Sequence, residues 1–150
     1  MPHIHEKIDF TVEVFVVYKN RVLLRLHDKY RIWLSVGGHI ELDEDPNQAA
    51  IREVKEEVGL DIVLIDTRKF KGKNSEYEEL IAPVGMDRHK ISDTHEHVTS
   101  IYFAKSKTDK VIPEKETDQW KWCKRDEIEK LENIRPNVVY YAKRALDEVI

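Results

Sequence analysis

The feature that most constrains this chain is a strongly marked helix over residues 46–58. Asp45 is a favoured N-cap, Pro46 suits the first helical position, and Gln48 completes a capping-box pattern. Gly59 ends the helix, because glycine readily adopts the left-handed conformation of a C-terminal cap. One arc of the helix is apolar and is expected to face a core; its members are Ala50, Ile51, Val54 and Val58.

A neighbouring arc of the same helix carries three carboxylates at spacing i, i+3, i+4, namely Glu53, Glu56 and Glu57. Like charges at this spacing repel, and the helix dipole disfavours negative charge near the C-terminus. A hard cation removes both penalties, since Mg²⁺ prefers carboxylate oxygens. Arg52 can pair with one carboxylate and hold its orientation. On these residues alone, a solvated acidic helix face is the alternative.

The spacing around the carboxylates forms a longer pattern. Gly38 is followed after five residues by Glu44, and after seven more by the run Arg52-Glu53-Val54-Lys55-Glu56-Glu57-Val58-Gly59-Leu60. This pattern resembles the Nudix box at every specified position: Gly, five residues, Glu, seven residues, then Arg-Glu-aliphatic-any-Glu-Glu-any-Gly-aliphatic. The resemblance implies a Nudix-type α/β/α sandwich with a mixed β-sheet, with residues 1–150 as a single domain and the box at 38–60.

The resemblance also implies a chemistry. A Nudix enzyme of this kind is a Mg²⁺-dependent hydrolase, with Mn²⁺ as a substitute ion, that cleaves a phosphoanhydride bond in a nucleoside diphosphate-linked substrate such as a nucleoside triphosphate. The implied metal ligands are Glu53, Glu56, Glu57 and the backbone carbonyl of Gly37. Arg52 would orient the acidic residues, and Glu44 would support the site from behind them or through a bound water.

Carboxylates beyond the box are candidates for a supporting role. Many Nudix enzymes use a downstream glutamate, and Glu96 is the candidate here; its rivals are Glu114, Glu116 and Asp118. As the general base we expect Glu53 first and Glu96 second. On a strand, His95 and His97 would share one face while Glu96 points the other way, a pattern typical of a polar strand entrance.

Three further residues are candidates to contact the substrate. His39 lies within the box at a position that the motif leaves free, and it can approach a phosphate. Trp33 and Tyr77 can stack on a base. Tyr77 lies 17 residues beyond Leu60, a separation similar to that of a tyrosine in diadenosine polyphosphate hydrolases.

The remaining pattern indicates an α/β layered domain. Period-2 alternation and short apolar runs predict strands over residues 8–18, 21–26, 33–36, 62–70, 79–84, 98–105 and 119–123. Helices are predicted over residues 125–131 and 136–149. Lys19-Asn20 is the predicted hairpin turn, Gly37-Gly38 is expected to break the strand before it, and residues 71–78 and 85–96 are expected to be long polar loops.

Composition narrows the setting. The formal net charge of −4 argues against general binding to nucleic acid or an anionic membrane. No apolar run approaches the roughly 20 residues that span a bilayer, and the N-terminus has no apolar segment of signal-peptide type. Cys123 is the single cysteine, so the chain cannot form an internal disulfide. We expect a cytoplasmic protein whose partner is a nucleotide or another nucleoside diphosphate-linked small molecule, with a homodimer left open.

Several alternative functions remain at this point. A diadenosine polyphosphate or nucleotide-sugar hydrolase would carry the same box. A non-catalytic nucleotide-binding sensor is expected to lose box carboxylates, and none is lost here. An isopentenyl diphosphate isomerase relative needs a paired cysteine and glutamate in the site, whereas Cys123 lies far beyond the box. For RNA decapping, no basic and aromatic groove is evident.

Overall fold

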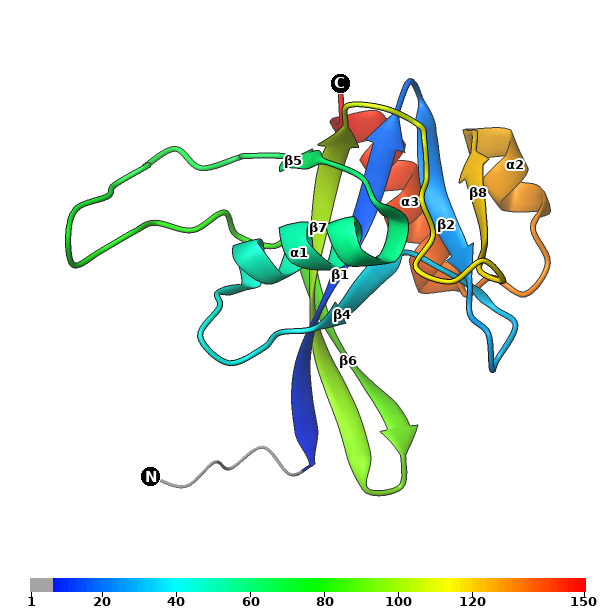
Figure 1. The fold of residues 1–150 in the computed structure, drawn as a ribbon, viewed down its shortest axis with the longest axis horizontal. Coiled ribbons are helices and arrows are strands. Elements are labelled where there is room, and N and C mark those ends of the chain that lie inside the picture. The colour runs from blue at the N-terminus through cyan, green and yellow to red at the C-terminus, as the bar shows by residue number, and fades with distance from the viewer. Residues whose placement is uncertain (1–6) are drawn as a thin grey trace.

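The computed structural model describes residues 7–150, which form a mixed sheet with helices on both faces (Figure 1). In chain order the elements are β1 (Ile8–Tyr18), β2 (Arg21–Leu26), β3 (Trp33–Leu34), β4 (Val36–His39), α1 (Pro46–Val58), β5 (Ile62–Leu64), β6 (Gly85–Ser92), β7 (His95–Ser106), β8 (Gln119–Cys123), α2 (Arg125–Lys130) and α3 (Pro136–Glu148). The strand order is β3-β2-β1-β7-β5, with β4 paired to β1, β6 to β7 and β8 to β2. The predicted α/β sandwich with a mixed sheet is confirmed.

Strand β1 organises the sheet. It pairs in parallel with β7 along ten register positions, from Ile8 opposite Glu96 to Val17 opposite Lys105. It also pairs antiparallel with β2 and with β4. The β1–β2 turn falls at Lys19-Asn20, as predicted, and both residues have positive φ (46° and 63°), which matches a tight hairpin.

Alternation along β1 divides the core into two layers, one beneath α1 and one beneath α3. These two helices lie on opposite faces of the sheet (Figure 1). Its even-numbered valines face α1, where they pack with apolar residues of that helix; this layer includes Val12, Val14, Val16, Ala50, Val54 and Val58. Its odd-numbered residues face α3; this second layer includes Phe15, Val17, Phe103, Val138, Ala142 and Ala145. Ile51, which we expected in the core, is 46% exposed. It lies about 100° around the helix axis from Ala50, at the margin of the buried arc.

Residues 85–96 and the pair Gly37-Gly38 differ from the sequence-based expectation. Residues 85–96 are not a loop, because β6 and the start of β7 pair antiparallel as a hairpin. Strand β6 has no buried residue: half-buried and exposed positions alternate over its first six residues and the last three positions are exposed, so it shows no apolar alternation. Gly37-Gly38 do not end a strand either: both belong to β4, opposite Glu13 and Val12.

The strand predicted over 62–70 ends at Leu64, and residues 79–84 form no strand. Residues 65–84 instead make a long excursion away from the sheet (Figure 1). Asn47 of α1 fastens its return, since its side-chain amide donates to the Ile81 carbonyl and accepts from the Ile81 N–H, both at 2.9 Å. Within residues 7–150, no helix has both the length and the apolar character needed to cross a membrane.

Candidate active site

Helix α1 begins and ends where its sequence signals place it. The Asp45 side chain accepts from the Gln48 N–H, and Gln48 returns a bond to the Asp45 N–H, so the capping box is complete. Gly59 is left-handed (φ 68°) and its N–H donates to the Lys55 carbonyl. These two caps fix the ends of α1 and so hold the arc that carries Glu53, Glu56 and Glu57 in one orientation.

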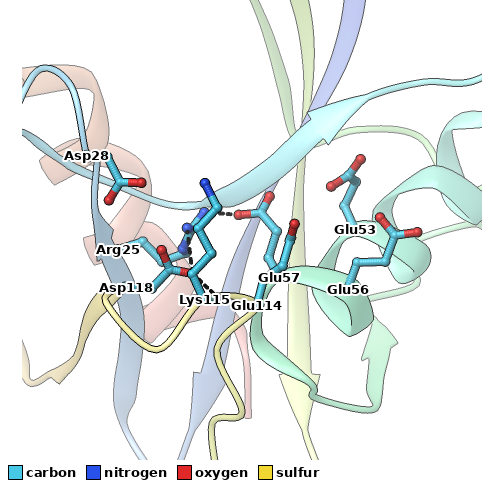
Figure 2. A pocket seen from close by; sticks show the side chains of 8 residues that line it. All are labelled: Arg25, Asp28, Glu53, Glu56, Glu57, Glu114, Lys115 and Asp118. Carbon is cyan, nitrogen blue, oxygen red and sulfur yellow. Dashed lines mark hydrogen bonds and ion pairs between the residues drawn. The ribbon is translucent and has the colours of Figure 1, made fainter.

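The acidic arc of α1 forms one wall of a pocket of about 370 Å³ (Figure 2). The pocket is lined by Arg25, Asp28, Glu53, Glu56, Glu57, Glu114, Lys115 and Asp118. Six of these side chains are carboxylates and two are cations. Such an excess of negative charge is costly unless a cation enters, and carboxylate oxygens suit a hard divalent ion. The donor set therefore fits a divalent metal.

Arg52 ties the acidic residues together from outside the pocket. Its guanidinium donates to both oxygens of Glu44, at 3.0 and 2.6 Å. It also donates to Glu53 at 2.9 Å and to Glu56 at 3.1 Å. A last bond, at 2.9 Å, reaches the His39 carbonyl of β4. The bonds from Arg52 lower the pKa of Glu44 and keep it ionised, so Glu44 holds Arg52 in place as a counter-charge.

Glu53 sits under opposing influences. Burial, and then repulsion from Glu56 and Glu114, raises its pKa, while the hydrogen bond and charge of Arg52 act in the other direction. Its carboxylate lies directly against Gly38, where a Cβ would be 2.4 Å from the Glu53 carboxyl carbon and one of its oxygens. Gly38 must therefore be glycine, because a larger residue would collide with the Glu53 side chain. A cation bound nearby would counteract the burial and the carboxylate repulsion that raise the pKa of Glu53.

Glu57 is the most buried of the three carboxylates, with a relative exposure of 8%. One of its oxygens accepts from the Gly37 N–H at 3.2 Å, and the other is paired with Arg25. Arg25 is also 3.6 Å from Asp118. Each Glu57 oxygen still has a free lone pair, because a carboxylate offers about four acceptor sites.

The segment before β8 supplies the opposite wall of the pocket. Two backbone bonds attach it to the end of α1: Ile112 N–H to the Val58 carbonyl at 2.9 Å, and Glu114 N–H to the Glu57 carbonyl at 3.1 Å. These bonds bring Glu114 to the pocket. Sequence reasoning named Glu114 and Asp118 only as rivals, and it missed Arg25, Asp28 and Lys115. The available signal for Arg25 was a charged residue within the apolar run of β2.

Glu96 is not one of the described residues that line this pocket. It lies at the start of β7 and forms an ion pair with Arg88 of β6 at 2.5 Å. Because β6 was expected to be a loop, the sequence offered no reason to foresee this partner. Glu116 is also absent from the described pocket walls.

The three candidate substrate contacts lie apart from the pocket walls in the part of the chain that is described. The imidazole Nε2 of His39 lies 3.2 Å from Asp9 Oδ2. Trp33 packs at the margin of the α3-side core. Tyr77 lies exposed in the 65–84 excursion and donates to Glu79. The structure thus assembles the box carboxylates but not His39, Trp33 and Tyr77 around one cavity.

Comparison with known proteins bears on the same residues. A family model described as the NUDIX domain matches residues 9–143. A NUDIX-family hydrolase from Clostridium perfringens is 36% identical, and the match covers 93% of this chain and 96% of that one with a TM-score of 0.85. A MutT NUDIX hydrolase from Burkholderia pseudomallei shares the fold at 18% identity, covering 97% of this chain and 100% of that one with a TM-score of 0.64.

A curated relative, the dihydroneopterin triphosphate diphosphatase of Haemophilus influenzae, is 47% identical over 60 residues. That match covers 39% of this chain and 38% of the relative, so the chain spans well under half of the relative's length. The family model covers nearly all of the described residues, including the whole box and the segment that closes the pocket. This chain belongs to the Nudix hydrolases, enzymes that act on phosphoanhydride bonds and generally use divalent metal ions.

Proposed function

We propose that this protein is a Mg²⁺-dependent pyrophosphohydrolase that cleaves a phosphoanhydride bond in a nucleoside diphosphate-linked substrate, in the first place a nucleoside triphosphate. The observation that carries the proposal is the pocket in which six carboxylates meet two cations. An all-oxygen donor set of this kind favours Mg²⁺ or Mn²⁺ over softer ions.

Some box residues would bind the metal directly, and others would position those ligands. Glu53, Glu56 and Glu57 would be its carboxylate ligands, and the Gly37 carbonyl would be a further one. Arg52 orients Glu53 and Glu56 by direct hydrogen bonds. Glu44 fixes Arg52 through two bonds to its oxygens. When bound, the metal would neutralise phosphate charge and acidify a water molecule.

The two cations in the pocket suit a phosphate-bearing substrate. Arg25 and Lys115 line the pocket among the carboxylates, and Arg25 is paired with Glu57 and lies 3.6 Å from Asp118 (Figure 2). Phosphate oxygens need such counter-charges in a pocket that would otherwise repel them. We therefore assign Arg25 and Lys115 to the substrate's phosphates.

The proton acceptor must reach the attacking water and be less tightly held by metal than the ligands are. Glu114 satisfies the position requirement, because its backbone is bonded to α1 and its side chain lines the pocket. Glu53 remains a second candidate because it lines the pocket beside the other box carboxylates, and metal coordination would weaken it as a base. Glu96 is a weaker candidate because of its ion pair with Arg88.

The Haemophilus relative, by its name, acts on a triphosphate. Dihydroneopterin triphosphate therefore belongs in the assay beside the nucleoside triphosphates. The diadenosine polyphosphate alternative rests on Tyr77, which lies exposed and outside the described pocket walls.

The test is a substrate panel with products identified by mass. Nucleoside triphosphates, dihydroneopterin triphosphate, ADP-ribose and diadenosine tetraphosphate are incubated with enzyme in Mg²⁺, Mn²⁺ or excess chelator. We expect turnover of a triphosphate with Mg²⁺ and none with chelator. Glu57→Gln should lower kcat by several orders of magnitude, whereas Glu129→Gln, on exposed α2, is the matched control. Full activity in chelator, or in Glu57→Gln, would contradict the assignment.

A further inference from the structure

A second polar cluster lies on the other face of the sheet. Strands alternate their side chains, so Asp9 of β1 shares the α3-side face with Phe15, and α1 packs on the opposite face. The register sets Asp9 opposite His97 of β7, and His97 opposite His89 of β6. His95 lies two residues before His97, on the same face. This end of the sheet projects beyond the helices (Figure 1).

Three side chains of this cluster converge on one point. One ligand atom each from Asp9, His95 and His97 lie within 4.8 Å of one another. The closest pair, His95 Nε2 and Asp9 Oδ2, is 2.8 Å apart. The ring of His97 lies edge-on to that of His95, with 5.4 Å between centroids. Each of the three residues is partly buried, so the groups are held in place yet reachable from solvent.

These spacings suit a small metal ion. An ion bound at about 2.0–2.2 Å to nitrogen and oxygen ligands in tetrahedral geometry separates those ligand atoms by about 3.4 Å. From 2.8 Å, the Asp9–His95 contact would open by about 0.6 Å, and the other two pairs, which lie within 4.8 Å, would close by at most about 1.4 Å. Side-chain rotation supplies such changes without moving the paired strands.

Two more histidines surround the three. His39 Nε2 is 3.2 Å from the same Asp9 oxygen, and its ring lies 5.0 Å from that of His97. His89 lies 5.4 Å from His97 on the other side, and its Nδ1 is 2.8 Å from Asp87 Oδ1. His39 and His89 thus add two further imidazoles next to the three converging groups, each held by a carboxylate.

We propose that Asp9, His95 and His97 form a second metal site, distinct from the box, for a borderline transition ion of the Zn²⁺ class. Two imidazoles and one carboxylate favour such an ion, whereas the box pocket offers only oxygen ligands. Three protein ligands leave a coordination position for water or an anionic group.

Strand β4 stands between the two sites. The backbone amide of Gly37 bonds to Glu57, and Gly38 lies against the Glu53 carboxylate. The next residue, His39, reaches Asp9 with its side chain.

The test is metal binding by the full chain carrying no affinity tag. The protein is stripped with chelator and titrated with Zn²⁺ by calorimetry in millimolar Mg²⁺, which occupies the box. A separate metal-free sample is titrated with Co²⁺ as a spectroscopic probe of nitrogen ligation, since Co²⁺ would not displace bound Zn²⁺. We expect one Zn²⁺ to bind in excess Mg²⁺. Co²⁺ bound at the same site should show the intense visible absorption of a four-coordinate ion.

Matched variants locate the bound ion. His97→Gln and His95→Gln should each weaken Zn²⁺ binding by more than about 100-fold, because losing a direct ligand costs more than the roughly 10–100-fold typical of losing a partner that only orients a ligand. His27→Gln removes a half-buried histidine just beyond the end of β2, outside the cluster, and should leave binding unchanged. Asp9→Asn tests the third ligand separately, and circular dichroism verifies the fold of each variant. Glu57→Gln should keep the Zn²⁺ event, which separates this proposal from the proposed function.

Three results would overturn the second site. The first is no Zn²⁺ bound in excess Mg²⁺, which would mean that the histidines only pair with Asp9. The second is binding that survives in folded His95→Gln and His97→Gln. The third is binding that disappears with Glu57→Gln, which would place the ion in the box pocket.

Discussion

Gly37 and Gly38 are neighbours in one strand, yet the structure gives them different reasons to be glycine. A Cβ at Gly38 would be 2.4 Å from the Glu53 carboxylate, at the free end of a side chain. A Cβ at Gly37 would be 2.1 Å from the Val12 carbonyl oxygen, part of the backbone of β1. Gly38→Ala should therefore damage catalysis, and Gly37→Ala should damage the fold.

The size of the Gly38 effect follows from the contact. Ordinary van der Waals contact begins at 3.4 Å, so the Glu53 carboxylate must withdraw by about 1 Å. That movement also strains its 2.9 Å bond from Arg52. A displacement of about 1 Å in a positioning group costs on the order of 10²-fold in rate, or about 2.7 kcal/mol in the barrier. We expect kcat to fall by about that factor and the Mg²⁺ concentration for half activity to rise.

The Gly37 effect appears in stability instead. The β1 and β4 backbones must separate locally, and such overpacking costs about 1–3 kcal/mol. Urea melts measure the free energy of unfolding for both variants, and steady-state assays over a Mg²⁺ series measure kcat for the folded fraction. If Gly38→Ala retains normal turnover and Mg²⁺ dependence, the Glu53 carboxylate does not act from the position described here. If Gly37→Ala is as stable as the parent, the β1–β4 contact is looser than described.

Two other predictions concern carboxylates. At saturating Mg²⁺, we expect Glu114→Gln to lower kcat by more than about 10²-fold and to remove the acidic limb of the pH profile. Glu96→Gln is the comparison variant. If the acidic limb is unchanged in Glu114→Gln, the role of general base returns to Glu53. Glu13 of β1 has its pKa raised from 4.5 to about 7, first by burial and then by Asp87, so the folded protein binds a proton that the unfolded chain has lost between those values. Stability should thus fall as pH rises through that window, and Glu13→Gln should gain at most about 3 kcal/mol at pH 8 and nothing near pH 4 in urea melts. A gain of equal size at both pH values would contradict the burial of a charged Glu13.

The box helix could be predicted because its signals are local. Asp45, Gln48 and Gly59 act within a few residues of one another, and the capping bonds they make are those expected. The position of Arg52 among the acidic residues was also foreseen, since it follows from helical spacing. Each of these inferences needed no knowledge of distant pairing.

The rest of the site depends on contacts between distant segments. Arg25 meets Glu57 across 32 positions, and only the sheet brings β2 beside α1. Glu114 reaches the pocket through backbone bonds that no side-chain pattern encodes. His95 and His97 were expected to share one strand face, but their approach to Asp9 and to His89 was not foreseen. Strand β6 is an edge strand, and neither of its faces is buried enough to leave an apolar alternation.

The parallel pairing of β1 with β7 has a consequence for how the chain folds. Ile8 pairs with Glu96, so the ladder joins residues 88 positions apart. During synthesis at about 5–20 residues per second, the first strand waits on the order of ten seconds for its partner. Such non-local pairing slows folding, because a long loop must close before its contacts compensate. The central strand β1 is thus synthesised first and is among the last to gain its full set of strand pairings. Until then its apolar valines remain exposed to contacts with other chains.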